Sequence, residues 1–381
     1  MDLPARIGLN LLYLVPGAVG GTEIYARELI PRLAAARPDI EWIVYAGREA
    51  GPTLVAENWP TNVRVKTLPV KCVNKPLRIA FEYTLLPLIA ARDGVKLLHS
   101  LGQTSPLFSR GARVVTIHDL IYHHYPETFP GPAQKGLELI VPASVKRAHR
   151  VSADSQATKD DLTAVYGIDP SHTDVVYLGF GYTAPAEYPD EATLRAQFEL
   201  GERPVVLCVA AALAHKNVPR LFEAFAAMAD DSPALVVVGH AGLEQDNLKA
   251  LAERLGIGGR VHFTGWIESE ELEGLYRMAD CFAYPTLIEG FGLPVLEAMQ
   301  RGTPVVCSNT TSVPELAGDA ALLVDPLDVA AIAAAIERAL TDKKLVAQLI
   351  ERGYERVKLF TWEKCADDTL ACYAAALQRK T

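Results

Sequence analysis

The chain has 381 residues, of which 50% are hydrophobic and 22% are charged, and its formal net charge is −9. This length predicts two domains with sizeable cores, and the composition is typical of a soluble globular protein. The acidic balance argues against a general nucleic-acid binder. The most apolar run, residues 205–214, is about half as long as the roughly 20 residues of a membrane-spanning helix, so no integral membrane segment is expected.

Residues 1–8 lack the basic start and apolar core of a signal peptide. The six cysteines are scattered and include no Cys-x-x-Cys pair, which predicts buried thiols in a reducing compartment rather than disulfides or a zinc site. The expected location is therefore the cytoplasm. Peripheral contact with the inner face of a membrane stays open, because the basic run at residues 146–150 is either a solvated helix face or a contact for an anionic surface.

Short apolar runs alternate with longer helical patterns through the first half of the chain. Gly20 and Gly21 follow the first run, and an apolar helix is expected from Ile24 onward. Residues 179–189 hold two glycines, two prolines and several small residues, which predicts a linker with the domain boundary at 184/185. Seven strands are expected before the linker, at residues 7–11, 42–46, 63–67, 97–100, 114–118, 150–153 and 173–176.

The second half repeats the alternation more regularly. Its apolar runs are continuous, without polar residues at every second position, which is typical of a parallel sheet covered by helices on both faces. An amphipathic helix over residues 362–377 follows a break near residue 360. Six strands are expected at residues 205–209, 235–238, 261–263, 281–284, 305–307 and 321–324, and helices at 218–229, 244–255, 268–278, 294–301 and 329–340. The predicted fold class is α/β, with two doubly wound domains facing across a cleft.

The stretch from Glu289 to Glu297 carries the clearest chemistry. It follows an expected strand, and Pro294 suits the first turn of a helix. Gly290 and Gly292 let a ligand approach the backbone, and the amides of the first helical turn form a site for an anion. Two carboxylates beside that site are explained if the ligand also carries hydroxyls, as a nucleoside diphosphate sugar does. Taken alone, Glu289 is equally well explained as a solvated residue, and Glu297 as a residue that favours the helix dipole, as either is by ligand binding.

Together with its surroundings, this stretch resembles the retaining GT-B glycosyltransferases of family 4, also called glycosyl transferases group 1, whose signature is Glu-x7-Glu. The resemblance covers nearly the whole chain, because similar pieces occur in the family's order. They are residues 20–23, 116–119, 151–155, 261–266, 279–285, 302–306 and 313–315. The resemblance implies a GT-B fold, with an acceptor-side domain of residues 1–184, a helix near 362–381 packing back on it, and a donor-binding domain of residues 185–361.

The resemblance also implies a role for each matching residue. Glu297 would bind the ribose hydroxyls and Glu289 the hydroxyls of the donor sugar. Lys216 would be the cationic partner of the diphosphate, and the Gly21 loop would approach the phosphates and the sugar. The backbone of Gly265, Trp266 and Ile267 would meet the nucleobase, and the loop and helix start of Gly290, Phe291, Gly292 and Leu293 would hold the diphosphate.

His118 would face the anomeric side of the sugar, so His118, Glu289 and Lys216 are the expected catalytic residues. The implied reaction transfers a UDP- or GDP-linked sugar, with retention of configuration, to an acceptor hydroxyl in a bacterial-type glycan, glycolipid or glycosylated metabolite. In the family's mechanism the acceptor attacks the front face and the departing phosphate takes its proton. A lone histidine at a strand end is otherwise more often structural.

The chain departs from its relatives where the family commonly carries an arginine before the lysine. Residues 210–212 are alanines, so Lys216 lacks that partner. His215 when protonated, or Arg220 one turn further along a helix, could supply the second charge; alternatively, Lys216 and the helix start suffice. No metal and no other cofactor is expected, because the chain holds no Asp-x-Asp and a cationic side chain can neutralise the leaving diphosphate.

Two other classes of function remain open at this point. One is a different enzyme on the same fold, such as a nucleotide-sugar epimerase or a phosphorylase, because fold does not fix function. The other is a nucleotide-sugar-binding partner subunit without catalysis, which the presence of both glutamates and Lys216 argues against. A dehydrogenase is disfavoured because no Gly-x-Gly-x-x-Gly follows the first strand. The sequence leaves the base, the sugar, the acceptor and the oligomeric state undetermined.

Overall fold

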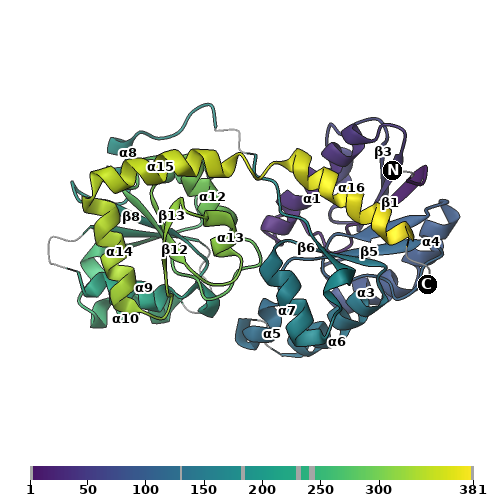
Figure 1. Ribbon diagram of the computed structural model, residues 1–381, viewed down its shortest axis with the longest axis horizontal. Coiled ribbons are helices and arrows are strands. Elements are labelled where there is room, and N and C mark those ends of the chain that lie inside the picture. The colour runs from purple at the N-terminus through teal and green to yellow at the C-terminus, as the bar shows by residue number, and fades with distance from the viewer. Residues whose placement is uncertain (1–2, 129–130, 182–184, 229–232, 240–244, 379–381) are drawn as a thin grey trace. The chain divides into compact units, whose positions relative to one another are not determined.

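The computed structural model describes residues 3–128, 131–181, 185–228, 233–239 and 245–378. The chain divides into two compact units, the first of residues 1–179 and 360–381 and the second of residues 180–359 (Figure 1). The division at 179/180 lies five residues before the predicted boundary. Residues 182–184 of the predicted linker lie outside the described residues.

The first unit is built on a parallel sheet of seven strands in the order β3-β2-β1-β4-β5-β6-β7. All seven predicted strands are present, with ends shifted by at most two residues. The strands are β1 (Arg6–Asn10), β2 (Glu41–Ala46), β3 (Val63–Thr67), β4 (Leu97–Ser100), β5 (Ala112–Ile117), β6 (Arg150–Ala153) and β7 (Thr173–Val175). The helices are α1 (Gly21–Ala36), α2 (Gly51–Val55), α3 (Lys75–Thr84), α4 (Leu86–Arg92), α5 (Ile121–His124), α6 (Pro132–Arg147), α7 (Gln156–Tyr166) and α16 (Trp362–Gln378).

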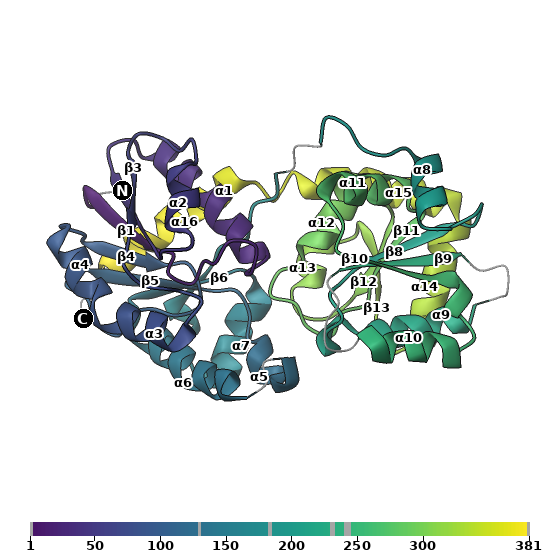
Figure 2. The same ribbon diagram turned by 180° about the vertical axis from the view of Figure 1, so that it is seen from behind.

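The second unit has a parallel sheet of six strands in the order β10-β9-β8-β11-β12-β13, and the six predicted strands are all confirmed (Figure 2). They are β8 (Val205–Val209), β9 (Ala234–Val238), β10 (Val261–Gly265), β11 (Cys281–Tyr284), β12 (Val305–Ser308) and β13 (Ala321–Val324). The helices are α8 (Glu191–Gln197), α9 (Val218–Ala226), α10 (Gln245–Arg254), α11 (Ser269–Met278), α12 (Leu293–Gln300), α13 (Val313–Ala317), α14 (Val329–Thr341) and α15 (Lys343–Val357). Both sheets therefore belong to the predicted α/β class with doubly wound topology.

Helix α15 is absent from the sequence-based expectations. Its 15 residues begin after Asp342, whose side chain accepts a hydrogen bond from the backbone N–H of Leu345 at 3.0 Å. An aspartate at this position stabilises the first turn by satisfying an otherwise unpaired donor. The helix buries few residues, among them Leu349 and Gly353. This aspartate, placed three residues before Leu345, is the signal that could have revealed the helix.

The last helix, α16, packs within the first unit rather than beside the helices that precede it in the chain. It lies against α1, β5 and β6. The hydroxyl of Tyr373 is 2.8 Å from Nδ1 of His99, whose Nε2 is 2.8 Å from the hydroxyl of Thr116. At the start of the helix, Trp362 packs so closely on Gly179 that a Cβ on this glycine would lie 2.4 Å from it.

All six cysteines are buried and free, which confirms the prediction of buried thiols without disulfides. Burial raises the pKa of Cys208 to about 12, so its thiol stays protonated at neutral pH. In the described part of the chain, no helix is both long and hydrophobic enough to cross a bilayer.

A buried carboxylate sits where β1 and β4 end in the first unit. Glu82 of α3 is 1% exposed and accepts hydrogen bonds from Asn10 Nδ2 at 2.9 Å and from the Thr104 hydroxyl at 3.0 Å. Asn10 also donates to the hydroxyl of Ser100 at 3.0 Å. Burial raises the pKa of Glu82 to about 7, although Arg78 and the two donors act to lower it.

The raised pKa of Glu82 makes stability depend on pH. Between the pKa of an unfolded glutamate, about 4.3, and the folded value of about 7, the folded protein binds one proton more than the unfolded chain. Stability is therefore expected to fall as the pH rises through this range, by on the order of 3 kcal/mol from this group. Glu82→Gln, which cannot ionise, should remove that contribution.

Urea unfolding at about pH 5 and about pH 8 measures the effect. Glu82→Gln should be more stable than the parent at the higher pH and close to it at the lower pH. Glu337→Gln, on the exposed side of α14, is the matched control and should change neither value. A difference between Glu82→Gln and the parent that stays the same at both pH values would contradict the assignment.

Candidate active site

The strand order places a switch point between β8 and β11 of the second unit. These two strands are neighbours, while the chain runs outward from β8 toward β9 and from β11 toward β12. In doubly wound sheets, ligands bind beyond the carboxyl ends of the strands at such a point. Lys216 follows β8, at the end of a 3-10 turn of residues Ala214–Lys216, and Glu289 follows β11. Both predicted residues therefore lie at the position where this topology binds ligands.

Lys216 and Glu289 form an ion pair although they are 73 residues apart in the chain. Nζ of Lys216 lies 2.6 Å from Oε1 of Glu289, and the two side chains are 17% and 9% exposed. The same carboxylate oxygen accepts from the hydroxyl of Tyr284 at 2.7 Å and lies 2.9 Å from the hydroxyl of Thr286. Nζ of Lys216 also donates to the Tyr284 hydroxyl at 3.1 Å. One oxygen of Glu289 is thus held from three sides.

The charge of this pair is set by its surroundings. Burial alone would raise the pKa of Glu289, but the ammonium of Lys216 and the hydroxyl of Tyr284 hold it below its usual value. Glu289 is therefore ionised at neutral pH. Its second oxygen, Oε2, is the part of the side chain best placed to accept from a ligand hydroxyl.

The start of α12 presents backbone amides beside this pair. Gly292 is the residue before the helix, and its φ of 108° is a conformation that side chains rarely adopt. The hydroxyl of Ser312 fixes the loop by donating to the backbone carbonyl of Phe291 at 2.7 Å. The same hydroxyl lies 3.0 Å from the backbone carbonyl of Glu289. Gly290 and Leu293 complete the turn into the helix. An anion at this helix start would meet backbone N–H groups of the first turn and the positive end of the helix dipole.

Glu297 lies one turn into α12 and has its own support. The hydroxyl of Tyr276 donates to Oε2 of Glu297 at 2.8 Å, and Nη1 of Arg301 donates to its backbone carbonyl at 2.7 Å. The guanidinium of Arg301 lies 4.9 Å from the centre of the Tyr276 ring and pairs with Glu273, which is 0% exposed, at 2.5 Å. Burial raises the pKa of Glu297, and the Tyr276 hydrogen bond offsets part of that rise.

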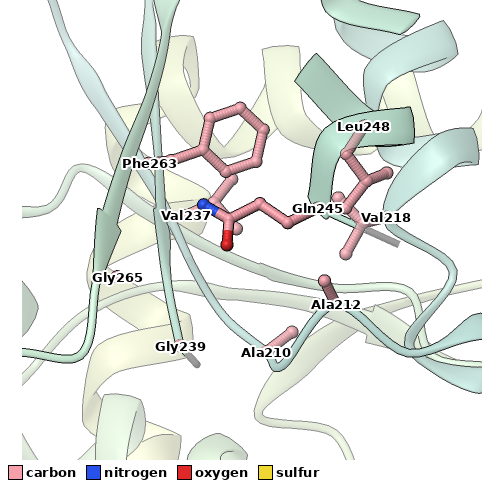
Figure 3. Close-up of a pocket in the computed structure, with 9 residues that line it drawn as sticks. All are labelled: Ala210, Ala212, Val218, Val237, Gly239, Gln245, Leu248, Phe263 and Gly265. Atoms are coloured by element: carbon pink, nitrogen blue, oxygen red, sulfur yellow. The ribbon is translucent and has the colours of Figure 1, made fainter. Parts of the chain in front are cut away.

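A pocket opens at the carboxyl ends of β8, β9 and β10 (Figure 3). Gly265, which was predicted to meet the nucleobase, lines it together with Phe263. Figure 3 shows Gln245 extending from the start of α10 into this pocket. Its Oε1 is buried and has no hydrogen-bond partner within the described residues. Of the neighbouring predicted residues, Trp266 is 68% exposed and Ile267 is partly buried.

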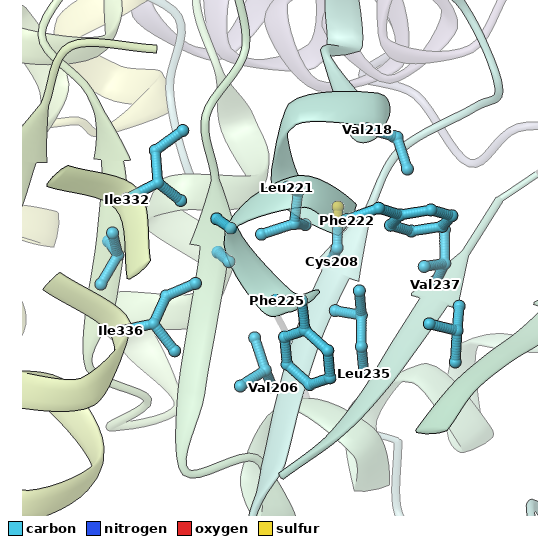
Figure 4. Packing of buried hydrophobic residues seen from close by; sticks show 14 of the residues in the cluster. Val206, Cys208, Val218, Leu221, Phe222, Phe225, Leu235, Val237, Ile332 and Ile336 are labelled. Atoms are coloured by element: carbon cyan, nitrogen blue, oxygen red, sulfur yellow. The ribbon is translucent and has the colours of Figure 1, made fainter. Parts of the chain in front are cut away.

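The wall of the pocket is continuous with the hydrophobic core of the second unit. Val218 and Val237 line the pocket and also belong to the packed layer between the sheet and helices α9 and α14 (Figure 4). The other labelled members of that layer are Val206, Cys208, Leu221, Phe222, Phe225, Leu235, Ile332 and Ile336. Each large side chain buried there contributes about 1.5–3 kcal/mol to the free energy of folding. The close packing of this layer makes the adjoining wall of the pocket rigid.

His215 and Arg220, the two candidates for a second cation, do not supply a free positive charge at the diphosphate site in this structure. Burial, together with the charge of Lys216, lowers the pKa of His215 to about 4, so its ring is neutral at pH 7. Nη1 of Arg220 donates to Oδ1 of Asn217 at 2.9 Å. A second positive charge at the diphosphate therefore requires a shift in the pKa of His215 or a new position of the Arg220 side chain, and both stay predictions.

His118 belongs to the first unit, where it directly follows β5 and is buried. Its Nδ1 lies 2.7 Å from Oδ2 of Asp154 and its Nε2 lies 2.8 Å from the carbonyl of Leu101. Burial would lower the pKa of His118, but Asp154 and the carbonyl raise it above the usual value. Since both ring nitrogens face acceptors, a ring contact with a sugar hydroxyl needs exchange of the Leu101 hydrogen bond. This constraint was not visible in the sequence.

Gly21, the other predicted residue of the first unit, is the first residue of α1 and is exposed. The preceding Gly20 has a φ of 57°, and a Cβ there would meet no atom within 4 Å. Gly20 is thus required by backbone conformation rather than by crowding within this unit. Glu23 stabilises the same loop by accepting from the backbone N–H of Gly17 at 2.9 Å.

Three residues of the second unit's site were missed from the sequence. Tyr284, Tyr276 and Gln245 had been assigned only to strands and helices. For Tyr284, a signal did exist, because it is the last residue of a buried strand at the carboxyl edge, where ligands bind. For Tyr276 and Gln245, helical periodicity gives no indication that a polar group is directed to a site.

Comparison with known proteins agrees with this site. Residues 190–356 match the family described as Glycosyl transferases group 1, and residues 19–180 match Glycosyltransferase Family 4. The chain is 31% identical to O-antigen chain mannosyltransferase B of Escherichia coli over 68% of this chain and 69% of that protein. It is 30% identical to a D-inositol 3-phosphate glycosyltransferase of Salinispora tropica over 98% of this chain and 86% of that protein.

Among solved structures, HepE of Anabaena in complex with UDP and glucose has the same fold. Its TM-score is 0.73 at 23% identity, with 97% of this chain and 99% of that chain covered. Because the relatives are named as transferases, they favour an enzyme over the alternative of a binding subunit without catalysis. The chain belongs to the family 4, group 1 glycosyltransferases and is a glycosyltransferase of the GT-B fold.

Proposed function

We propose that this glycosyltransferase moves a sugar from a UDP- or GDP-linked donor to an acceptor hydroxyl, with retention of anomeric configuration. The observation that carries the proposal is the Lys216–Glu289 pair beside the start of α12 at the switch point. A lysine, the carboxylate that it pairs with and the backbone amides at the start of the following helix suit a ligand that carries both phosphates and hydroxyls.

The donor is proposed to lie along the carboxyl edge of the second sheet. Its base would enter the pocket at Gly265, where the amide of Gln245 offers both a donor and an acceptor. Its ribose hydroxyls would bind Glu297, which Tyr276 holds in place. UDP is the nucleotide named with the HepE structure, which supports a uridine nucleotide as the first to test.

In the proposed reaction, the bond between the anomeric carbon and the diphosphate oxygen breaks, and its electron pair leaves with the diphosphate. Lys216 and the α12 amides stabilise that charge, which is the type of preorganised electrostatic stabilisation that contributes most to many enzymes. Glu289 Oε2 holds a sugar hydroxyl. The acceptor oxygen bonds to the same face of the anomeric carbon, and its proton passes to the departing phosphate.

The acceptor is proposed to be a hydroxyl of a bacterial-type glycan, glycolipid or glycosylated metabolite. The relatives named for an O-antigen chain and for D-inositol 3-phosphate support a carbohydrate or polyol. Lys216 and the helix start supply the charge that a divalent cation provides elsewhere, so we propose that no metal is needed. Turnover that persists in excess EDTA is the expected result.

The two glutamates give the sharpest test. A thermal-shift screen with UDP, GDP, ADP and TDP first identifies the nucleotide, since a ligand at 100 times its Kd adds roughly 2.7 kcal/mol of stability. Glu297→Ala should then weaken binding of the free nucleotide about 10- to 150-fold, which corresponds to about 1.5–3 kcal/mol for a hydrogen bond to a charged group. Glu289→Ala should leave nucleotide binding nearly intact and lower turnover.

Calorimetry measures the affinities, and Glu337→Ala on the exposed side of α14 is the matched control. Because Glu289→Ala leaves Lys216 without its carboxylate, Glu289→Gln is the second variant that separates loss of charge from loss of fold. Unchanged nucleotide affinity in Glu297→Ala would refute the placement of the ribose.

A further inference from the structure

The outward face of helices α3 and α4 in the first unit is unusual for a surface. Eight residues between 75 and 92 are exposed, and the six in the middle are uncharged. We define these six as the α3–α4 patch: Pro76, Leu77, Ala80, Thr84, Leu85 and Leu88. By comparison, α15 also exposes eight residues, and five of them are charged: Lys343, Lys344, Glu351, Arg352 and Glu355.

The members of the patch lie together because of helical spacing and helix packing. Leu77, Ala80 and Thr84 are three and four residues apart, which places them on one face of α3. Helix α4 follows directly and packs against α3 (Figure 2). The buried residues of α3 are Phe81 and Glu82. Leu77 is 48% exposed and Leu88 is 61% exposed, so the patch is open along its length.

Positive charge lies at both ends of this uncharged face. Lys71 and Lys75 lie at one end and Arg92 at the other, and all three are exposed. Residues 71–113 hold seven Lys or Arg and only two acidic residues. Glu82 is one of these and is buried, and Asp93 is the other and pairs with Lys66 at 2.8 Å. The segment is therefore basic within a chain of net charge −9.

The two units of the chain also differ in their balance of basic and acidic residues. Residues 1–179 and 360–381 hold 22 basic and 20 acidic residues, whereas residues 180–359 hold 15 basic and 26 acidic residues. The second unit would be repelled by an anionic surface, and the first would not. A surface that binds this protein through negative charge must therefore meet the first unit.

We propose that the α3–α4 patch docks on an anionic lipid bilayer, with its leucines at the boundary of headgroups and acyl chains and its lysines on the headgroups. An apolar face rimmed by Lys and Arg is the chemistry of an interfacial helix. Two copies of this chain meeting through the patch would instead place Lys71, Lys75 and Arg92 of each copy against the same cations of the other. Residues 71–92 contribute no exposed acidic residue, and the nearby carboxylate of Glu49 accepts from the backbone N–H groups of Cys72 and Val73.

Vesicle flotation with the full chain tests the proposal, using phosphatidylcholine alone and phosphatidylcholine mixed with phosphatidylglycerol. Binding is expected only to the anionic vesicles and should weaken as salt rises from about 0.1 to about 0.5 M. Lys71→Ala/Lys75→Ala should bind about 25-fold more weakly, or about fivefold for each lysine. Leu77→Glu/Leu88→Glu should bind the anionic vesicles about tenfold or more weakly, because it removes two apolar contacts and adds two negative charges that the vesicle repels.

Val55→Glu/Leu327→Glu is the matched control, since these residues are 62% and 60% exposed and lie outside the patch. It should bind as the parent does. The proposal is overturned if the parent binds neither vesicle or both equally, or if Leu77→Glu/Leu88→Glu binds like the control. It is also overturned if sedimentation shows a dimer that Leu77→Glu/Leu88→Glu dissociates. Nucleotide affinity, measured in parallel, reports on the proposed function independently.

Discussion

Replacing Lys216 with alanine is expected to lower the turnover number about 10²- to 10³-fold. Its ammonium is the charge held at the switch point, 2.6 Å from Oε1 of Glu289. Because the departing diphosphate gains negative charge in the proposed transition state, loss of this preorganised cation should affect the rate more than the affinity for the donor. The rate of nucleoside diphosphate release from the donor sugar, once the nucleotide screen has identified it, is the measurement.

Lys343→Ala, an exposed lysine of α15, is the control and should leave the rate unchanged. Lys216→Arg keeps the charge and should recover part of the loss. His215→Ala tests the second cation: since the pKa of His215 is lowered to about 4, its rate profile should run parallel to that of the parent from about pH 5 to about pH 9. A rate for Lys216→Ala within about tenfold of the parent would contradict the assigned role.

Replacing Glu273 with leucine is expected to lower the free energy of unfolding by about 3–5 kcal/mol, since it leaves a buried arginine without its carboxylate. Glu273 is 0% exposed and Arg301 is 5% exposed, and Arg301 also contacts the Tyr276 ring and the backbone carbonyl of Glu297. Arg301→Met should cost less, because Arg277 still pairs with Glu273. The double variant Glu273→Leu/Arg301→Met should lose much less than the sum, because no buried charge is then left without a partner.

Urea unfolding of the four proteins gives the coupling energy. Arg277→Met is the matched control, because Arg277 pairs with the same glutamate at 2.5 Å but is 44% exposed, and it should cost less than about 1 kcal/mol. The double variant should still bind nucleotide more weakly than the parent, since Arg301 holds the backbone of Glu297. Additive losses in the double variant would show that the pair is not coupled.

The strands could be predicted because their apolar runs are local properties of the sequence. A stretch such as Val205–Val209 is buried on both faces and cannot be a surface segment. Helix α15 could not be predicted by the same criterion, because it buries little and resembles a solvated segment apart from its aspartate cap. Local burial therefore predicts the sheets better than the helices at the surface.

The candidate site was predictable to the extent that it follows motifs. Glu289 and Glu297 stand in one short stretch, and Lys216 stands in another. The ion pair between Lys216 and Glu289 depends on β8 and β11 becoming neighbours, which no local pattern encodes. The hydrogen bonding of His118 likewise depends on Asp154, which is 36 residues away and directly follows the neighbouring strand β6.

The position of α16 has a consequence for how the protein is made. The first unit takes its last helix from residues Trp362–Gln378, so the intervening segment is synthesised before that unit can be completed. Until then the face of β5 and β6 that α16 covers stays bare, and His99 lacks the Tyr373 hydroxyl. After residue 179 has been added, roughly 200 further residues must be synthesised before α16 is complete. At ordinary rates of elongation this takes about 10 to 40 seconds. The second unit, contiguous in sequence, therefore has all its strands and helices synthesised before the last helix of the domain that begins the chain.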